Sequence, residues 1–233
     1  MQTAPQTQPA PAAQPKPRKA APPPEYRADQ IAGLEPDALV RLLEDPGATE
    51  FQKAKACQRL ASTGGAEAVP PLAALLTHPT LSHYARYGLE PNPAPAAADA
   101  LRAALSSVKG KLLVGVINSI GARRDPEAAG ALAKLLRDPD LEVAQAAAAA
   151  LGRIGGPVAA KALQDALGTA KEPVRTAAAA AGLVCAEGLL AAGERDRALA
   201  FYDLLMQPGV ARPVRLAAMH ATIAAETSIG RPR

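Results

Sequence analysis

The sequence has few aromatic residues and few cysteines. Only 3% of its 233 residues are aromatic and Trp is absent, so it lacks many of the side chains that stabilise strands. Its two cysteines, Cys57 and Cys185, fall in different units of the repeat described below. A disulfide needs Cα atoms within about 7 Å of each other. We therefore expect both cysteines to be small buried hydrophobic residues.

Long apolar runs are also missing from the sequence. By this reading none reaches the length of about 18 residues that a membrane span requires, and the N-terminus lacks the apolar core of a signal peptide. The sequence thus predicts a chain with no membrane span.

Residues 1–28 are rich in proline and alanine, with eight prolines in the first 24 positions. Such a segment cannot build a core, and we expect a disordered, partly polyproline-like arm. An arm of this kind often follows a removed export signal. A periplasmic or exported location therefore stays open beside a cytoplasmic one, as does the question whether Met1 is the native start.

The formal net charge of +4 is concentrated at the N-terminus. Of 26 basic and 22 acidic residues, the first 27 positions hold four and one, which leaves 22 basic and 21 acidic residues. The remainder is nearly neutral and offers no basic surface to neutralise phosphates. This disfavours a nucleic-acid partner.

Alanine, the strongest helix former, is the commonest residue, and an internal repeat organises the chain. "AEAVPPLAALLTHP" (66–79) matches "PEAAGALAKLLRDP" (126–139), with leucines at i, i+3 and i+4 followed by a proline. This spacing predicts a helix with one apolar face that ends before the proline.

A second type of helix follows each of the first. Its examples are "KLLVGVINSIG" (111–121), "LEVAQAAAAALGRIGG" (141–156), "EPVRTAAAAAGLV" (172–184) and "RPVRLAAMHATI" (212–223). Small residues recur three and four positions apart, which lets helices pack closely. Several examples end on Leu-Gly or Ile-Gly, and we expect this glycine to supply a left-handed helix stop.

These helices form pairs of about 30 to 40 residues, which is the pattern of an α-solenoid. We predict an all-α fold over residues 29–230 with about six helical pairs, preceded by the disordered arm. The first helices begin near residues 36, 66, 95, 126, 157 and 194, and their partners near residues 50, 81, 109, 140, 171 and 212.

The motif D-P-x-x-V-x-x-A-A-x-A-L-G-x-I-G, nearly complete in 138–155, resembles HEAT repeats of the bacterial type first noted in bilin lyases. "YARYGLEPNPAPAAADALRAAL", "KGKLLVGVINSIGARRD" and "AEGLLAAGERDRALAFYDLL" are similar to HEAT-repeat proteins of planctomycetes and verrucomicrobia. The resemblance implies a solenoid, often exported, with no established catalytic residue. Ala198 and Tyr202 also give residues 183–206 a likeness to a tetratricopeptide hairpin.

In this architecture the second helices line the concave surface, where partners bind. Alignment of Leu89 with Leu151 places Tyr84 toward the core and His83 at the surface, where it is a weaker candidate. Equivalent positions on the later helices predict a concave strip with an apolar floor. The candidate partner-binding residues are Arg86, Tyr87, Ile117, Asn118, Gln145, Ala148, Arg175, Arg215 and Met219.

The sequence contains no recognisable catalytic arrangement. The three histidines, His78, His83 and His220, have no metal-ligand spacing. Asp138 and Asp140 suit a turn in which they cap the next helix. We therefore expect no catalytic, cofactor-binding or metal-binding residues, and a protein that is not an enzyme.

The sequence favours a non-catalytic scaffold that binds a protein partner on the concave face of the solenoid. One alternative is an accessory subunit that binds a small ligand or a cofactor-bearing protein, as in the bilin-lyase resemblance. A nucleic-acid-binding solenoid is the second alternative and is disfavoured. We expect the last repeat to have an exposed apolar end, formed by parts of Val214 to Ile223, that is covered by a partner, by self-association or by further sequence.

Overall fold

The computed structural model describes residues 29–227, so the predicted arm lies outside the described residues. Every regular element within that range is helical, as the sequence predicts. A short helix, α1 (Asp29–Ala32), precedes six pairs: α2 (Pro36–Glu44) with α3 (Glu50–Thr63), α4 (Val69–Ala74) with α5 (Ser82–Leu89), α6 (Pro95–Ala104) with α7 (Gly110–Arg123), α8 (Ala129–Leu135) with α9 (Leu141–Ile154), α10 (Gly156–Thr169) with α11 (Val174–Ala191), and α12 (Arg195–Leu205) with α13 (Arg212–Thr227).

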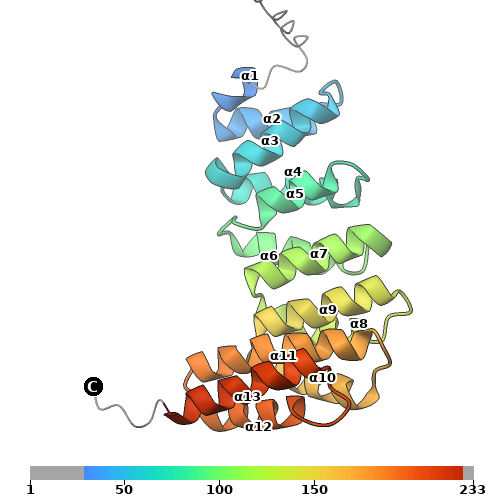
Figure 1. Cartoon of the computed structure of the whole chain (residues 1–233). Coiled ribbons are helices and arrows are strands. Elements are labelled where there is room, and N and C mark those ends of the chain that lie inside the picture. Colours follow the sequence, from blue (N-terminus) through green and yellow to red (C-terminus); the bar gives the residue numbers. More distant parts are fainter. Residues whose placement is uncertain (1–28, 228–233) are drawn as a thin grey trace, which may run out of the picture.

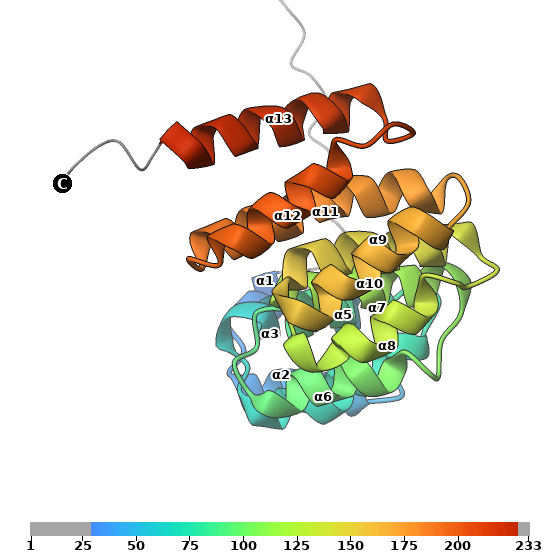
Figure 2. The ribbon, with the colours of Figure 1, turned by 90° about the horizontal axis from the view of Figure 1, so that it is seen from below.

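The pairs stack in chain order into two layers (Figure 1). The second helices, α3, α5, α7, α9, α11 and α13, form the nearer layer in that view, and the first helices lie behind them. Seen along the stack, the C-terminal pairs are displaced toward the side of the second helices (Figure 2). The fold is therefore the α-solenoid predicted from the repeat.

The helices begin close to their predicted positions. The largest differences, of three residues, are at α4, α8 and α11, and the cause is clearest at α11. This helix begins at Val174 instead of near residue 171. Proline has no N–H to donate, and the residue before a proline avoids the helical conformation. Glu172 and Pro173 accordingly form a turn, and the helix begins directly after it.

The predicted turn at 138–140 also caps its helix as expected. The side chain of Asp140 accepts a hydrogen bond of 3.0 Å from the backbone N–H of Glu142, and Asp138 accepts one of 2.9 Å from the N–H of Asp140. These bonds satisfy donors that the start of α9 would otherwise leave unpaired.

The core is a ladder of large side chains, one from each first helix. All six are fully buried: Leu39, Leu72, Leu101, Leu132, Leu163 and Phe201. Tyr202, on the helix that resembles a tetratricopeptide hairpin, is also fully buried. Both cysteines are buried and unpaired, which confirms their prediction as small core residues.

Glycines allow the second helices to approach each other closely. A Cβ atom on Gly121 would lie 2.9 Å from the Cα of Ala150, and one on Gly152 would lie 2.7 Å from the carbonyl oxygen of Ala181. The prediction that Gly121 stops its helix is wrong. It packs inside α7, and Arg124 takes the left-handed position with a φ of 52°.

One helix meets the length and apolarity of a membrane span. α11 is an 18-residue apolar helix, so the prediction that no apolar run reaches this length is wrong. The helix lies against α9, α10, α12 and α13 and buries eight of its residues. Its apolar character is therefore accounted for by packing at the centre of the C-terminal repeats.

Candidate binding groove on the second helices

The second helices expose one row of equivalent residues. Tyr87, Asn118, Ala149 and Ala180 follow each other at a constant interval along α5, α7, α9 and α11, and all four are exposed. The positions come from successive repeats, so the row crosses the stack from one pair to the next. Tyr87 and Asn118 were predicted as partner-binding residues, and both belong to this exposed row.

The residues that directly precede Asn118 and Ala149 in the sequence do not lie at the surface. Ile117 and Ala148 are fully buried, so their prediction as exposed contact residues is wrong. Each second helix packs against its own first helix and also against the next second helix. Its buried face is therefore wider than the single apolar stripe of a surface helix, and it includes these two positions.

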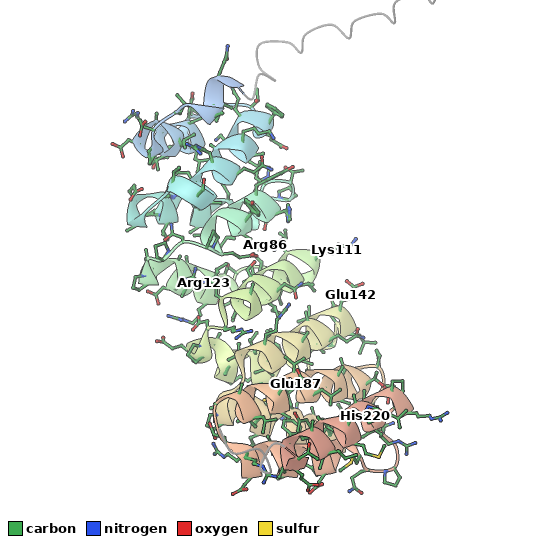
Figure 3. The ribbon with its side chains drawn as sticks, turned by 60° about the vertical axis from the view of Figure 1, so that its left-hand side comes forward. Arg86, Lys111, Arg123, Glu142, Glu187 and His220 are labelled. Atoms are coloured by element: carbon green, nitrogen blue, oxygen red, sulfur yellow. The ribbon has the colours of Figure 1, made fainter. Side chains whose placement is uncertain are left out.

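Arg86 occupies the same position on α5 and lies between α5 and α7 (Figure 3). Its guanidinium donates hydrogen bonds to the carbonyl of Gly115, at 3.1 Å, and to the Ser119 hydroxyl, at 3.3 Å. Burial lowers the pKa of Arg86, and the nearby Glu90 carboxylate opposes that shift. The side chain thus joins two repeats and does not stand free for a partner.

Arg123 also joins repeats. One of its terminal nitrogens donates to the backbone carbonyls of Leu89, Glu90 and Asn92, each at 2.8 Å. These bonds attach the end of α7 to the loop that follows α5. Arg123 therefore serves the solenoid itself.

A groove lies across α7, α9 and α11 on the exposed side of these helices. Its volume is about 700 Å³. It is lined by Val114, Asn118, Glu142, Gln145, Ala146, Ala149, Arg153, Ala177, Ala180, Ala181 and Val184. We call this surface the second-helix groove.

The middle of the groove contains exposed alanines, and charged residues of α9 lie toward the two ends of that helix, Glu142 near its start and Arg153 near its end. Ala149 and Ala180 are exposed in the floor, and Val184 is 46% exposed at one end. Arg153 donates a 3.3 Å hydrogen bond to the side-chain oxygen of Asn118. The groove therefore presents uncharged alanines between an acidic residue, Glu142, and a basic residue, Arg153.

The sequence predicted only part of this groove. Asn118 and Gln145 are among its lining residues, whereas Arg153 and Val184 were missed. Both fall outside the aligned positions, because each lies one helical turn beyond the exposed row. Their spacing of four residues from Ala149 and Ala180 is the signal that could have found them.

The other predicted residues lie apart from the groove. Tyr87 borders a separate hollow of about 540 Å³ between α3, α5 and α7. Arg175 is exposed at the start of α11 and pairs with Glu172 at 3.0 Å. Arg215 is half-buried on α13, and Met219 is 41% exposed there. The nine predicted residues do not form one site.

Potential metal ligands are not grouped within the part of the chain that the structure describes. No group of three or more His, Cys, Asp or Glu side chains within 29–227 is placed to hold a metal ion.

Residues 94–183 match the family model of HEAT repeats, and no curated protein matches the chain. One engineered protein of known structure is similar, with 22% identity and a TM-score of 0.48 over 82% of this chain and 96% of that chain. A second engineered protein has 21% identity and a TM-score of 0.49 over 82% of this chain and 58% of its own.

Human deoxyhypusine hydroxylase, solved in complex with glycerol, is also similar in structure. It has 18% identity and a TM-score of 0.44 over 86% of this chain and 99% of that chain. Scores of this size carry no argument about function. The chain is thus an α-solenoid whose central residues, 94–183, match HEAT repeats.

Proposed function

We propose that the protein is a non-catalytic scaffold that holds a protein partner in the second-helix groove. The occupant is the apolar face of a helix from the partner. HEAT solenoids are a general protein-interaction fold, and the narrower resemblance to bilin-lyase-type and planctomycete repeats is compatible with such a role. We also propose that the layer of second helices is the concave face of the solenoid, as the sequence predicted.

The observation that carries the proposal is the small apolar floor of the groove. Ala149 and Ala180 are exposed at the middle of the stack, where neighbouring helices already approach through Gly121 and Gly152. A floor without large side chains lets a partner helix come equally close, as in grooves that bind amphipathic helices. The polar groups of Gln145 and Arg153 at the edges would fix its register.

The charge of the groove favours a protein helix over a nucleic acid. Glu142 and Arg153 lie on the same lining, so its charges are mixed in sign and do not form a basic stripe. An apolar helix should bind with a shallow salt dependence, whereas binding to phosphates weakens steeply as salt rises.

The test is affinity capture from the native host with the full chain and two variants. Ala149→Glu combined with Ala180→Glu places charges on the floor and should abolish capture of the partner. Ala131→Glu makes the same change at an exposed alanine of α8 in the other layer, and it should retain the partner. A partner that both variants retain, or that both variants lose, would refute the groove as its site.

A further inference from the structure

The last helix carries an exposed apolar stripe that the groove does not use. α13 lies at the edge of the structure, and one of its sides faces away from every other described helix (Figure 2). Leu216, Met219 and Ile223 are 42%, 41% and 51% exposed. They are spaced three and four residues apart, so they lie on one face of the helix.

This stripe is opposite to the face that packs against the solenoid. The buried residues of α13 are Ala218 and Ala225, and the helix contacts α11 and α12. At 3.6 residues per turn, Met219 and Ile223 point away from the direction of Ala218 and Ala225. The fold therefore leaves the larger apolar side chains of α13 uncovered and buries its alanines.

A charged residue ends the stripe on each side. Arg212 begins the helix and Glu226 lies in its last turn, both on the same face as Met219 and both exposed. Neither takes part in an ion pair with another residue of the described range.

The positions of these two charges oppose the helix dipole. A cation is favoured at a helix C-terminus and an anion at the N-terminus, whereas α13 has Arg212 at its start and Glu226 near its end. The helix thus carries an arrangement that is unfavourable for it alone. An antiparallel neighbour with the same charges would offset this unfavourable arrangement. It would place the Glu226 carboxylate of one helix beside the Arg212 guanidinium of the other.

We propose that this stripe is an interface between two copies of the chain, which pair antiparallel through α13. Arg212 and Glu226 are equally far from Met219 along the helix, so a two-fold axis at Met219 brings Arg212 of each copy beside Glu226 of the other. The same axis places Leu216 opposite Thr222 of the second copy, within one residue of its Ile223. The stripe is therefore complementary to itself, as a two-fold interface requires.

The occupant is a second copy and not another kind of helix, because the stripe has one charge of each sign at opposite ends. A partner of a single charge would leave one end unpaired or repelled. The neighbouring repeats also meet through small residues, such as Gly152 against Ala181, and not through a row of Leu, Met and Ile.

The length of α13 predicts a weak dimer. Its 16 residues span about 24 Å at a rise of about 1.5 Å per residue. One helix pair of this length buries less than the area of about 1,200 Å² that stable complexes reach. The association should accordingly be reversible and depend on protein concentration.

The first test is sedimentation equilibrium of the full chain over a wide range of concentrations. The wild type should show a monomer–dimer equilibrium. Met219→Glu sets two carboxylates against each other at the axis and should leave a monomer with unchanged circular dichroism. Val158→Glu makes a comparable change at a 56% exposed residue of α10 and should dimerise like the wild type.

The second test reverses the charges. Arg212→Glu or Glu226→Arg alone creates a like-charge contact at both ends of the pair and should weaken dimerisation by roughly tenfold. Both reversals together should restore it, which a parallel pairing does not predict. A wild type that stays monomeric at every concentration, or a double variant as weak as the single ones, would overturn the proposal.

This proposal is independent of the groove. Ala149→Glu lies on α9 and should leave the dimer unchanged while it removes the partner, whereas Met219→Glu should do the reverse.

Discussion

The guanidinium of Arg86 lies directly over Gly115, in space that any larger residue would need. A Cβ atom on residue 115 would come within 2.7 Å of the guanidinium carbon, and Arg86 donates to the carbonyl of the same residue. The contact joins α5 to α7, so a glycine in the middle of a helix serves the junction between two repeats.

We expect alanine substitutions at three helical glycines to change the free energy of unfolding in different directions. Gly188→Ala, with no neighbour within 4 Å of the new Cβ, should stabilise the protein by about 1 kcal/mol through helix propensity. Gly115→Ala should cost about 1 kcal/mol, because it displaces the Arg86 guanidinium from its hydrogen bonds to Gly115 and Ser119. Gly152→Ala meets the backbone of Ala181 at 2.7 Å and should cost about 1–3 kcal/mol. Chemical denaturation measures all three, and equal effects would contradict the packing described.

Asp125 should contribute more to stability than the exposed acid that shares its partner. Its carboxylate is 7% exposed, pairs with Arg102 and accepts a bond of 3.1 Å from the N–H of Glu127. Asp125→Ala removes the ion pair and the cap and should cost about 3 kcal/mol. Asp99→Ala removes an exposed pair with Arg102 and should cost at most about 1 kcal/mol. Comparable losses in urea titrations would count against the buried pair.

Two adjacent alanines of α9 should respond differently to the same substitution. Ala148 is fully buried and Ala149 is exposed. Ala148→Glu forces a carboxylate into the packing between helices and should unfold the protein or cost several kcal/mol. Ala149→Glu should leave the melting temperature nearly unchanged. If the outcomes are reversed, the helix faces assigned to the second helices are wrong.

The cysteines should react with thiol reagents only after unfolding. Burial raises the pKa of Cys57 to about 12 and that of Cys185 to about 11, from an ordinary value of 9.0. The unfolded chain loses these protons first, so the free energy of unfolding should fall as the pH rises from about 9 toward about 11. Alkylation rates at neutral pH, with and without denaturant, measure the protection. Rapid labelling of the folded protein would contradict it.

The repeat in the sequence predicted the fold because the leucine spacing reports directly on helix faces. Leu72 and Leu132 matched in the sequence, and both are fully buried at equivalent positions of α4 and α8. The helix starts were located by the prolines and acidic caps, such as Asp140, that occur at the turns between the helices.

The surface of the second helices was harder to predict. Ile117 and Ala148 follow a single-stripe pattern that leaves them outside, yet contacts between successive second helices bury them. A sequence shows the packing within one pair, but the packing between pairs depends on how the stack is wound. The aligned positions had placed Asn118, Ala149 and Ala180 on the strip, and all three are exposed. The burial of the residues directly before them became clear only with that winding known.

Site-specific photo-crosslinking in the native host tests the proposed scaffold most directly. A photoreactive amino acid at position 149 or 180 should form a covalent adduct with the same partner protein, because both positions lie on the floor of the second-helix groove. The same amino acid at position 131, exposed on α8, should form none. Adducts at position 131 with none at 149 or 180 would contradict the groove as the site of partner binding.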